Sequence, residues 1–239
     1  MTRLLALIPA MIAAQLALTT LAQAGENNVM VELYTSQGCS SCPPADAYLG
    51  ELTKRPDVIA LSLHVDYWDY LGWQDTLAQQ GFTRRQIAYR DARGDRVVYT
   101  PQMVIQGSES IVGSDRDAVA AAIDAALATP PEASIRVVGK QGMLEAELLP
   151  GTDPMDATLW FAIYSRAETV DIRRGENSGM RITYNNVVTS LGRIGPWDGR
   201  QKATMVVPQP DVGEGIALWL QYGQAGQIFA ATKFEPPGS

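Results

Sequence analysis

The sequence predicts an α/β domain followed by an all-β domain, and two observations support this fold class. Residues 29–34 form an apolar run that passes through a turn into a helical pattern, and a second apolar run follows at residues 58–65. A strand–helix–strand unit of this length forms a parallel pair with a right-handed crossover. Residues 132–239 contain short alternating segments punctuated by Gly and Pro, which is typical of an antiparallel β-sandwich.

The first strand–helix junction contains both cysteines of the chain, Cys39 and Cys42. A helix start offers free backbone N–H groups and a partial positive charge, which favour a thiolate at Cys39. Pro43 and Pro44 suit the first helical turn because the N–H that proline lacks has no helical partner there. We expect Cys42 to lie one turn further along, more enclosed and within disulfide reach.

Three interpretations of this cysteine pair remain open. In a redox-active pair, the Cys39 thiolate attacks a disulfide and Cys42 resolves the mixed disulfide. A structural disulfide is the second interpretation, since closely spaced cysteines pair by default in oxidising compartments. A metal site is the least favoured, because a closed zinc site takes four ligands and the chain has two cysteines and one histidine, His64.

Residues 1–24 have the pattern of a secretory signal peptide. Arg3 precedes an apolar stretch over residues 4–21, and Ala22-Gln23-Ala24 forms a cleavage site. Cleavage leaves 239 − 24 = 215 residues beginning at Gly25, and the loss of Arg3 changes the net charge from −7 to 18 − 26 = −8. The sequence therefore predicts a periplasmic or secreted protein.

Charge and hydropathy narrow the class of partner. An acidic chain is a poor ligand for nucleic acids and anionic membranes, and no other stretch is long and apolar enough to span a bilayer. We expect an exported protein as the substrate or redox partner, and no organic cofactor.

The rest of the first half alternates strands and helices. The strand over residues 58–65 leads into an aromatic loop, residues 66–73, and then into a helix over residues 75–93 with Arg84, Arg85 and Arg90 pointing outward. Pro101 opens a third strand, where proline forfeits only a terminal ladder bond. A short hairpin partner at residues 110–113 and a helix capped by Ser114 or Asp115, running to about Ala128, complete this half.

This order of elements resembles the thioredoxin fold over about residues 28–129. The residues that carry the resemblance are Cys39-Ser40-Ser41-Cys42 and Thr100-Pro101. The resemblance implies that the Thr100–Pro101 bond is cis, that it lies beside the disulfide, and that Thr100 and Pro101 position the substrate backbone. The chain departs from the pattern in having no Trp before Cys39 and no Gly-Pro between the cysteines. Glu32 lies one residue further from the cysteine than the buried acid of thioredoxins.

Three motifs are also similar to those of an uncharacterised family of secreted bacterial thioredoxin-like proteins. They are residues 31–46, residues 64–69 (His-Val-Asp-Tyr-Trp-Asp) and residues 99–103 (Tyr-Thr-Pro-Gln-Met), and the match continues into residues 174–177. This resemblance implies a thioredoxin-like domain and assigns no substrate.

The predicted domain organisation is a signal peptide over residues 1–24, a thioredoxin-like domain over residues 25–130 and a β-sandwich-like domain over residues 131–239. The second domain contains no cysteine. Its seven expected strands cover residues 134–138, 143–149, 158–164, 182–188, 204–207, 216–222 and 228–232.

Further candidates have a functional and a structural interpretation. His64 is a base, a metal ligand or a hydrogen-bonded structural residue, and Met103 is a Cu(I) ligand or a core side chain. For Asp66 and Asp69, the functional interpretation is proton transfer and the structural one is that they are solvated loop carboxylates. The aromatic side chains Tyr67, Trp68, Tyr70 and Trp73 line a peptide groove or pack against the β-domain.

The polar loop over residues 173–179 has two interpretations. In the first, the loop leans over the cysteine site or binds a partner, and in the second it is a solvent-exposed hairpin loop.

The favoured function is thiol–disulfide exchange on exported proteins, with Cys39, Cys42, Thr100 and Pro101 as the site. The alternatives are a binding module with a structural disulfide, and copper handling through the cysteines with His64 or Met103.

Overall fold

The structure is a computed structural model that describes residues 27–140 and 142–236. The expected signal peptide, residues 1–24, lies outside the described residues.

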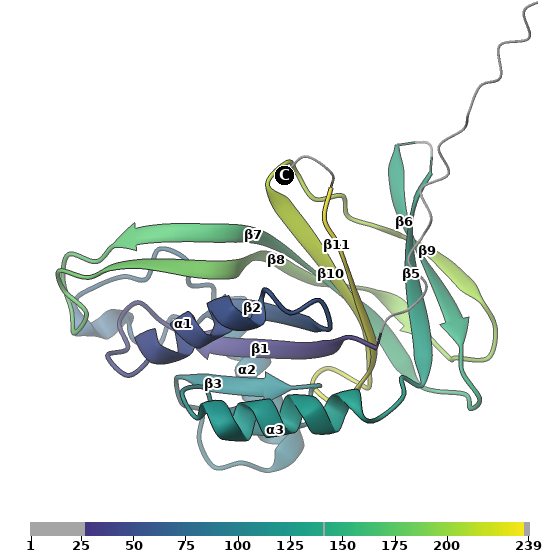
Figure 1. Cartoon of the computed structure of the whole chain (residues 1–239), viewed down its shortest axis with the longest axis horizontal. Coiled ribbons are helices and arrows are strands. Elements are labelled where there is room, and N and C mark those ends of the chain that lie inside the picture. Colours follow the sequence, from purple (N-terminus) through teal and green to yellow (C-terminus); the bar gives the residue numbers. More distant parts are fainter. Residues whose placement is uncertain (1–26, 141, 237–239) are drawn as a thin grey trace, which may run out of the picture.

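An eight-stranded mixed sheet runs through the molecule in the order β11-β10-β7-β8-β2-β1-β3-β4 (Figure 1). β1 (Val29–Thr35) and β2 (Val58–His64) form the expected parallel pair. β3 (Gln102–Ile105) lies antiparallel to β1 and forms a hairpin with β4 (Glu109–Val112). The strands and helices of the first half follow one another in the expected order.

The helices cover the two faces of this part of the sheet. Successive side chains of a strand point to opposite faces, so Val31 and Leu33 pack beneath α1 (Pro43–Leu52) and α3 (Arg116–Leu127). Met30 and Tyr34 face α2 (Gln80–Arg93) instead. The Asp115 side chain accepts a hydrogen bond from the backbone N–H of Ala118, which confirms it as the N-cap of α3.

The second half supplies seven strands, and every expected strand is present. β7 and β8 contain 15 and 17 residues and extend well beyond their expected bounds. Their outer ends form a long two-stranded hairpin that reaches past the sheet near the β1–α1 junction (Figure 1). The strands are β5 (Ala133–Lys140), β6 (Met143–Pro150), β7 (Ala157–Asp171), β8 (Arg181–Trp197), β9 (Ala203–Val207), β10 (Glu214–Gln221) and β11 (Ile228–Phe234).

The two halves share one sheet, which differs from the expectation of a sandwich built from residues 131–239 alone. β8 pairs with β2 at Val187 and Ser62, so β7, β10 and β11 extend the sheet of the first half. The physical reason is that β2 is an apolar strand buried along its whole length. Without β8 it would present an unpaired edge.

Sandwich-like packing is present in the second half. β5, β6 and β9 form a separate three-stranded sheet whose apolar face packs against β7 and β10. Ile135, Ala146 and Leu148 meet Leu159 and Leu218 in this core.

Two expectations about α2 are wrong. The helix begins at Gln80 rather than residue 75, because Asp75 turns inward and its carboxylate accepts the backbone N–H groups of Gln37 and Leu77. Arg85, expected to point outward, is 5% exposed and forms a buried ion pair with Glu32.

The Glu32–Arg85 pair sits in a polar network that joins the halves. Arg85 Nε lies 2.6 Å from Glu32 Oε1, and Arg85 Nη2 also donates to Gln221 of β10 at 3.0 Å. Gln221 Nε2 donates to the Tyr89 hydroxyl at 2.8 Å. Glu32 of β1 is thereby linked to α2 and, through Arg85, to β10.

The turn after β3 also contacts the second half. The backbone N–H of Ile228 donates to the carbonyl of Gln106 at 3.0 Å. Gly107 has a φ of +72°, and a Cβ at this position would lie 2.2 Å from the carbonyl oxygen of Gly226. Only glycine allows this close approach of the two turns.

Candidate functional site: the disulfide and its surroundings

Cys39 and Cys42 form a disulfide at the junction of β1 and α1, with a Cα–Cα distance of 5.4 Å. The helix itself begins at Pro43, so Cys42 is the N-cap and Cys39 lies in the preceding turn. The carbonyl of Cys42 accepts hydrogen bonds from the backbone N–H groups of Ala45 and Asp46. Cys39 was expected at the helix start, and it lies one turn before it.

Both cysteines are buried, which differs from the expected contrast between an accessible Cys39 and an enclosed Cys42. Cys39 is 1% exposed and Cys42 is 0% exposed, whereas Ser40 and Ser41 between them are exposed. Cys39 Sγ lies 3.4 Å from the Ser41 hydroxyl. The sulfur atoms are thus covered by other parts of the chain.

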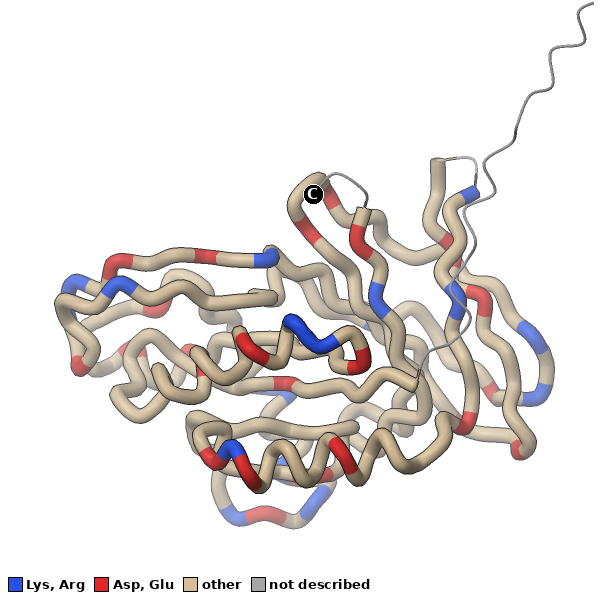
Figure 2. The backbone as a smooth tube through the Cα atoms, viewed as in Figure 1, with Lys and Arg blue, Asp and Glu red and all other residues tan. Residues whose placement is uncertain are grey.

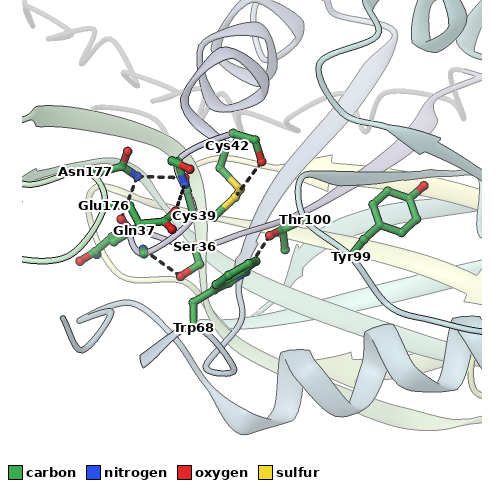
Figure 3. The surroundings of a disulfide bond; sticks show 12 residues. Ser36, Gln37, Cys39, Cys42, Trp68, Tyr99, Thr100, Glu176 and Asn177 are labelled. Carbon is green, nitrogen blue, oxygen red and sulfur yellow. Dashed lines mark hydrogen bonds between the residues drawn. A yellow bond between two sulfur atoms is a disulfide. The ribbon is translucent and has the colours of Figure 1, made fainter. Parts of the chain in front are cut away.

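The end of the β7–β8 hairpin, residues 172–180, lies against the cysteine turn, and we call it the hairpin tip. Asn177 Nδ2 donates to the carbonyl oxygens of Gln37 and Cys39 at 3.0 and 2.9 Å. The Ser40 N–H donates to the Glu176 carboxylate at 3.3 Å. Figure 3 shows Glu176 and Asn177 beside the cysteine turn. The interpretation that the loop over residues 173–179 leans over the site is confirmed.

Trp68 and Thr100 lie on the other side of the disulfide (Figure 3). Trp68 Nε1 donates to Thr100 Oγ1 at 2.8 Å, and a Cβ on Gly38 would lie 3.1 Å from Trp68 Cβ. The Thr100–Pro101 peptide is cis, as expected. A Cβ built on Gly113 would lie 3.3 Å from Pro101 Cβ and 3.1 Å from Ala45 Cβ, so Pro101 lies near the start of α1.

The aromatic loop over residues 66–73 braces the cysteine turn. Trp73 Nε1 donates to Gln37 Oε1 at 2.8 Å, and the Tyr67 hydroxyl donates to Gln86 Oε1 at 3.2 Å. Tyr70 differs from its neighbours in being 77% exposed, and its ring stacks on Trp68 with centroids 6.4 Å apart. The loop therefore presents one exposed aromatic ring next to the site.

A buried carboxyl group lies one helical turn behind Cys42. Asp46 is four residues further along, so both side chains leave the same face of the chain. Asp46 is 3% exposed and neither of its carboxyl oxygens has a hydrogen-bond partner. Burial raises its pKa to about 7, although the nearby His64 offsets part of this effect. The carboxyl group therefore exchanges its proton near neutral pH.

His64 and Asp75 form a buried pair close to Asp46. His64 Nδ1 lies 2.8 Å from Asp75 Oδ2, and the His64 ring meets the Tyr184 ring edge-on with centroids 4.5 Å apart. Burial raises the pKa of Asp75, but the hydrogen bonds from His64 and from backbone N–H groups outweigh it, and the net pKa is lowered. Burial, followed by the charges of Asp46 and Asp75, raises the pKa of Tyr184.

Several sequence candidates lie away from the disulfide or have structural roles. Met103 packs in the core beneath α1 and α3. The Thr83 hydroxyl donates to Asp66 at 2.6 Å, and Asp69 accepts the N–H of Asp75 at 3.1 Å. Among residues 27–140 and 142–236, no group of three or more His, Cys, Asp or Glu side chains is arranged to hold a metal ion.

Sequence reasoning did not single out Asp46 or Asp75, and it included Asn177 only as part of the loop expected to lean over the site. Asp46 could have been found, because its spacing of four from Cys42 places it on the cysteine side of the predicted helix. Asp75 carries no such signal, since it reaches the site from a separate loop.

No helix in the described part of the chain is long and apolar enough to cross a membrane. Acidic and basic residues are interspersed along the backbone rather than grouped by sign (Figure 2).

Comparisons with known proteins place the chain among its relatives. It is similar to the crystal structure of protein AGR_C_4864 from Agrobacterium tumefaciens, with 32% sequence identity and a TM-score of 0.76. The match covers 88% of this chain and 95% of that one. A search of curated proteins returns no match. The family model described as "Protein of unknown function (DUF1223)" matches residues 30–221, and the chain therefore belongs to the DUF1223 family.

Proposed function

We propose that the protein is an exported thiol–disulfide oxidoreductase whose reactive group is the Cys39–Cys42 disulfide. The observation that carries the proposal is that the buried carboxyl of Asp46 follows Cys42 of this disulfide by one helical turn. A purely structural disulfide is not broken in use, so it needs no proton donor beside the cysteine that would leave as a thiolate.

The first step is the attack of a substrate thiolate on Cys39 Sγ. A bond forms between the substrate sulfur and Cys39, the Cys39–Cys42 bond breaks, and Cys42 leaves as a thiolate. The protonated Asp46 carboxyl then gives its proton to Cys42, so that no thiolate remains buried.

The second step releases the substrate. A second substrate thiolate attacks the substrate sulfur of the mixed disulfide, and Cys39 leaves with the bonding electron pair. The substrate is oxidised by two electrons and the protein is reduced by two. The same steps in reverse reduce a substrate disulfide, and they begin with attack by the Cys39 thiolate.

The neighbours of the disulfide suit a peptide substrate. The cis Thr100–Pro101 peptide is tied to Trp68, and the exposed Tyr70 ring stacks on Trp68. Such amphipathic rings are enriched where proteins bind one another. We assign Thr100 and Pro101 the role of positioning the substrate backbone, as the thioredoxin resemblance implies.

The test is a redox equilibration of the purified protein in glutathione buffers, combined with exchange against a dithiol peptide. We expect a reversible two-electron transition at a potential within about 100 mV of those buffers, and transfer of the disulfide to the peptide. A potential below about −300 mV without transfer would instead establish a structural disulfide.

A second candidate is a binding module with a structural disulfide. The observation that favours it is the near-complete burial of Cys39 and Cys42. The same titration separates the two, because a structural disulfide resists the glutathione pool.

A further inference from the structure

The hairpin tip is hydrogen-bonded to the turn that carries the buried disulfide. Cys39 is 1% exposed even though its neighbours Ser40 and Ser41 are exposed. The side of Cys39 that faces the second half is held by Asn177, which is itself only 4% exposed.

The contacts between the hairpin tip and the cysteine turn are mainly polar. Asn177 makes two hydrogen bonds and Glu176 makes one. The backbone of Gly175 also lies against Trp73, since a Cβ there would be 3.2 Å from Trp73 Cβ. Individual hydrogen bonds of this kind contribute little net free energy, because water replaces them when they break.

The outer hairpin packs against α1 through β8, since a Cβ on Gly50 would lie 2.6 Å from Asn185 Nδ2. From Ala167 and Asn185 outward, β7 and β8 pair with each other and the ladder continues to Asp171 and Arg181. The buried Tyr184 and Ile172 anchor this ribbon, whereas the end of the tip is largely exposed. The exposed end of the tip lies beyond these anchors, so it can separate from the cysteine turn while the rest of the sheet stays intact.

The polar groups that the hairpin tip occupies are those that an extended peptide would use. Asn177 donates to two backbone carbonyls, of Gln37 and Cys39, and Glu176 accepts the backbone N–H of Ser40. A substrate backbone offers N–H donors and carbonyl acceptors of the same kind. The hairpin tip and an extended substrate therefore compete for the same backbone groups.

We propose that the hairpin tip is a lid over the Cys39–Cys42 disulfide, held shut by Asn177 and displaced by an extended cysteine-containing peptide. This inference rests on the proposed function for its biological purpose. The covering of the disulfide by the lid can be measured independently of that function. Asn177 acts here as a positioning residue, since it controls access to Cys39 without reacting.

The experiment measures how fast a water-soluble phosphine reduces the disulfide of the intact purified protein, with alkylation and mass spectrometry as the readout. We expect Asn177→Ala and the isosteric Asn177→Asp to be reduced at least tenfold faster than the wild-type protein. Asn177→Asp keeps the size of the side chain, removes both donors and places a negative charge opposite two carbonyl oxygens, so it breaks these contacts without leaving a cavity. The matched control is Arg174→Ala, an exposed residue of the same tip, which we expect to match the wild-type rate.

Glu176→Gln provides a second variant at an exposed position, in case Asn177→Ala lowers the melting temperature. It weakens only the contact with Ser40, and we expect a two- to fivefold faster reduction. Rates within twofold of wild type for Asn177→Asp and Glu176→Gln, with unchanged melting temperatures, would overturn the lid. Faster reduction without disulfide transfer to a peptide would uphold the lid and refute the oxidoreductase.

Discussion

The side-chain amide of Asn177 donates a hydrogen bond of 2.9 Å to the carbonyl oxygen of Cys39, a residue 138 positions earlier in the chain. This contact brings a hairpin of the second half onto the only disulfide of the protein, whose two cysteines both lie in the first half. The surroundings of the cysteine pair therefore include residues from both halves of the chain.

Asp46→Asn should change how stability depends on pH. The pKa of Asp46 in the folded protein is about 7, above its value in the unfolded chain, so its contribution to stability is fully present below about pH 4 and is lost as the pH rises through 7. The variant lacks this loss, so its free energy of unfolding relative to wild type should increase by about 2 to 3 kcal/mol from pH 5 to pH 8. Urea unfolding at both pH values measures the difference.

The matched control for this prediction is Asp75→Asn. The pKa of Asp75 is lowered in the folded protein, so its carboxylate stabilises the fold above the pKa of the unfolded chain. This variant should be less stable than wild type at both pH values. Equal pH slopes for wild type and Asp46→Asn would contradict the raised pKa of Asp46.

Cys42→Ser should trap a mixed disulfide on Cys39. Once the resolving thiol is gone, a peptide that carries an activated disulfide remains bound to Cys39. Incubation of the purified variant with such a peptide, followed by mass spectrometry, detects the adduct. Cys39→Ser should react at least tenfold more slowly, because its remaining thiol, that of Cys42, is fully buried at the N-cap position of α1. Equal labelling of both variants would remove the assigned order of attack.

Arg85→Met should destabilise the protein by about 3 to 5 kcal/mol, because it leaves the carboxylate of Glu32 buried without its cation. Chemical unfolding measures the loss. Arg84→Met, at the exposed neighbouring position of α2, should stay within about 0.5 kcal/mol of wild type. The double variant Glu32→Gln with Arg85→Met should recover part of the loss, and failure to recover any would show that packing rather than charge sets the cost.

Gly107→Ala should weaken the contact between the halves. The added Cβ would meet the carbonyl oxygen of Gly226 at 2.2 Å, so the two turns must separate, at a cost of about 3 kcal/mol or more. Gly94→Ala is the control, since Gly94 has a nearly identical φ of +73° with no atom within 4 Å of the added Cβ. It should cost about 1 kcal/mol from backbone strain alone. Thermal unfolding distinguishes the two, and equal losses would contradict the close approach.

Local patterns in the sequence were sufficient to predict much of the fold. The apolar runs before Cys39 and at residues 58–64 identified the parallel pair, and the alternation after residue 131 identified all seven later strands. The cysteine pair and the Thr100–Pro101 step identified the centre of the candidate site. These features are determined by residues close together in the sequence, and the periodicity of apolar residues shows such local structure.

Contacts between distant residues were the part that the sequence did not predict. The β8 segment has the same alternation whether it closes a separate sandwich or pairs with β2, so the continuous sheet was missed. Arg85 looks like an exposed helical residue until Glu32, 53 positions earlier, is placed beside it. Asp75 and the specific contacts of Asn177 were not predicted for the same reason, because the sequence of a polar loop does not show which distant residue it contacts.

The sharing of one sheet by both halves also sets an order of events during synthesis. The cysteine turn leaves the ribosome 138 residues ahead of Asn177, which corresponds to roughly ten seconds of chain growth. During that interval neither β8 nor the hairpin tip exists, so the thiols of Cys39 and Cys42 are open to their surroundings. Their first oxidation can therefore precede the closure that shields the bond in the finished molecule.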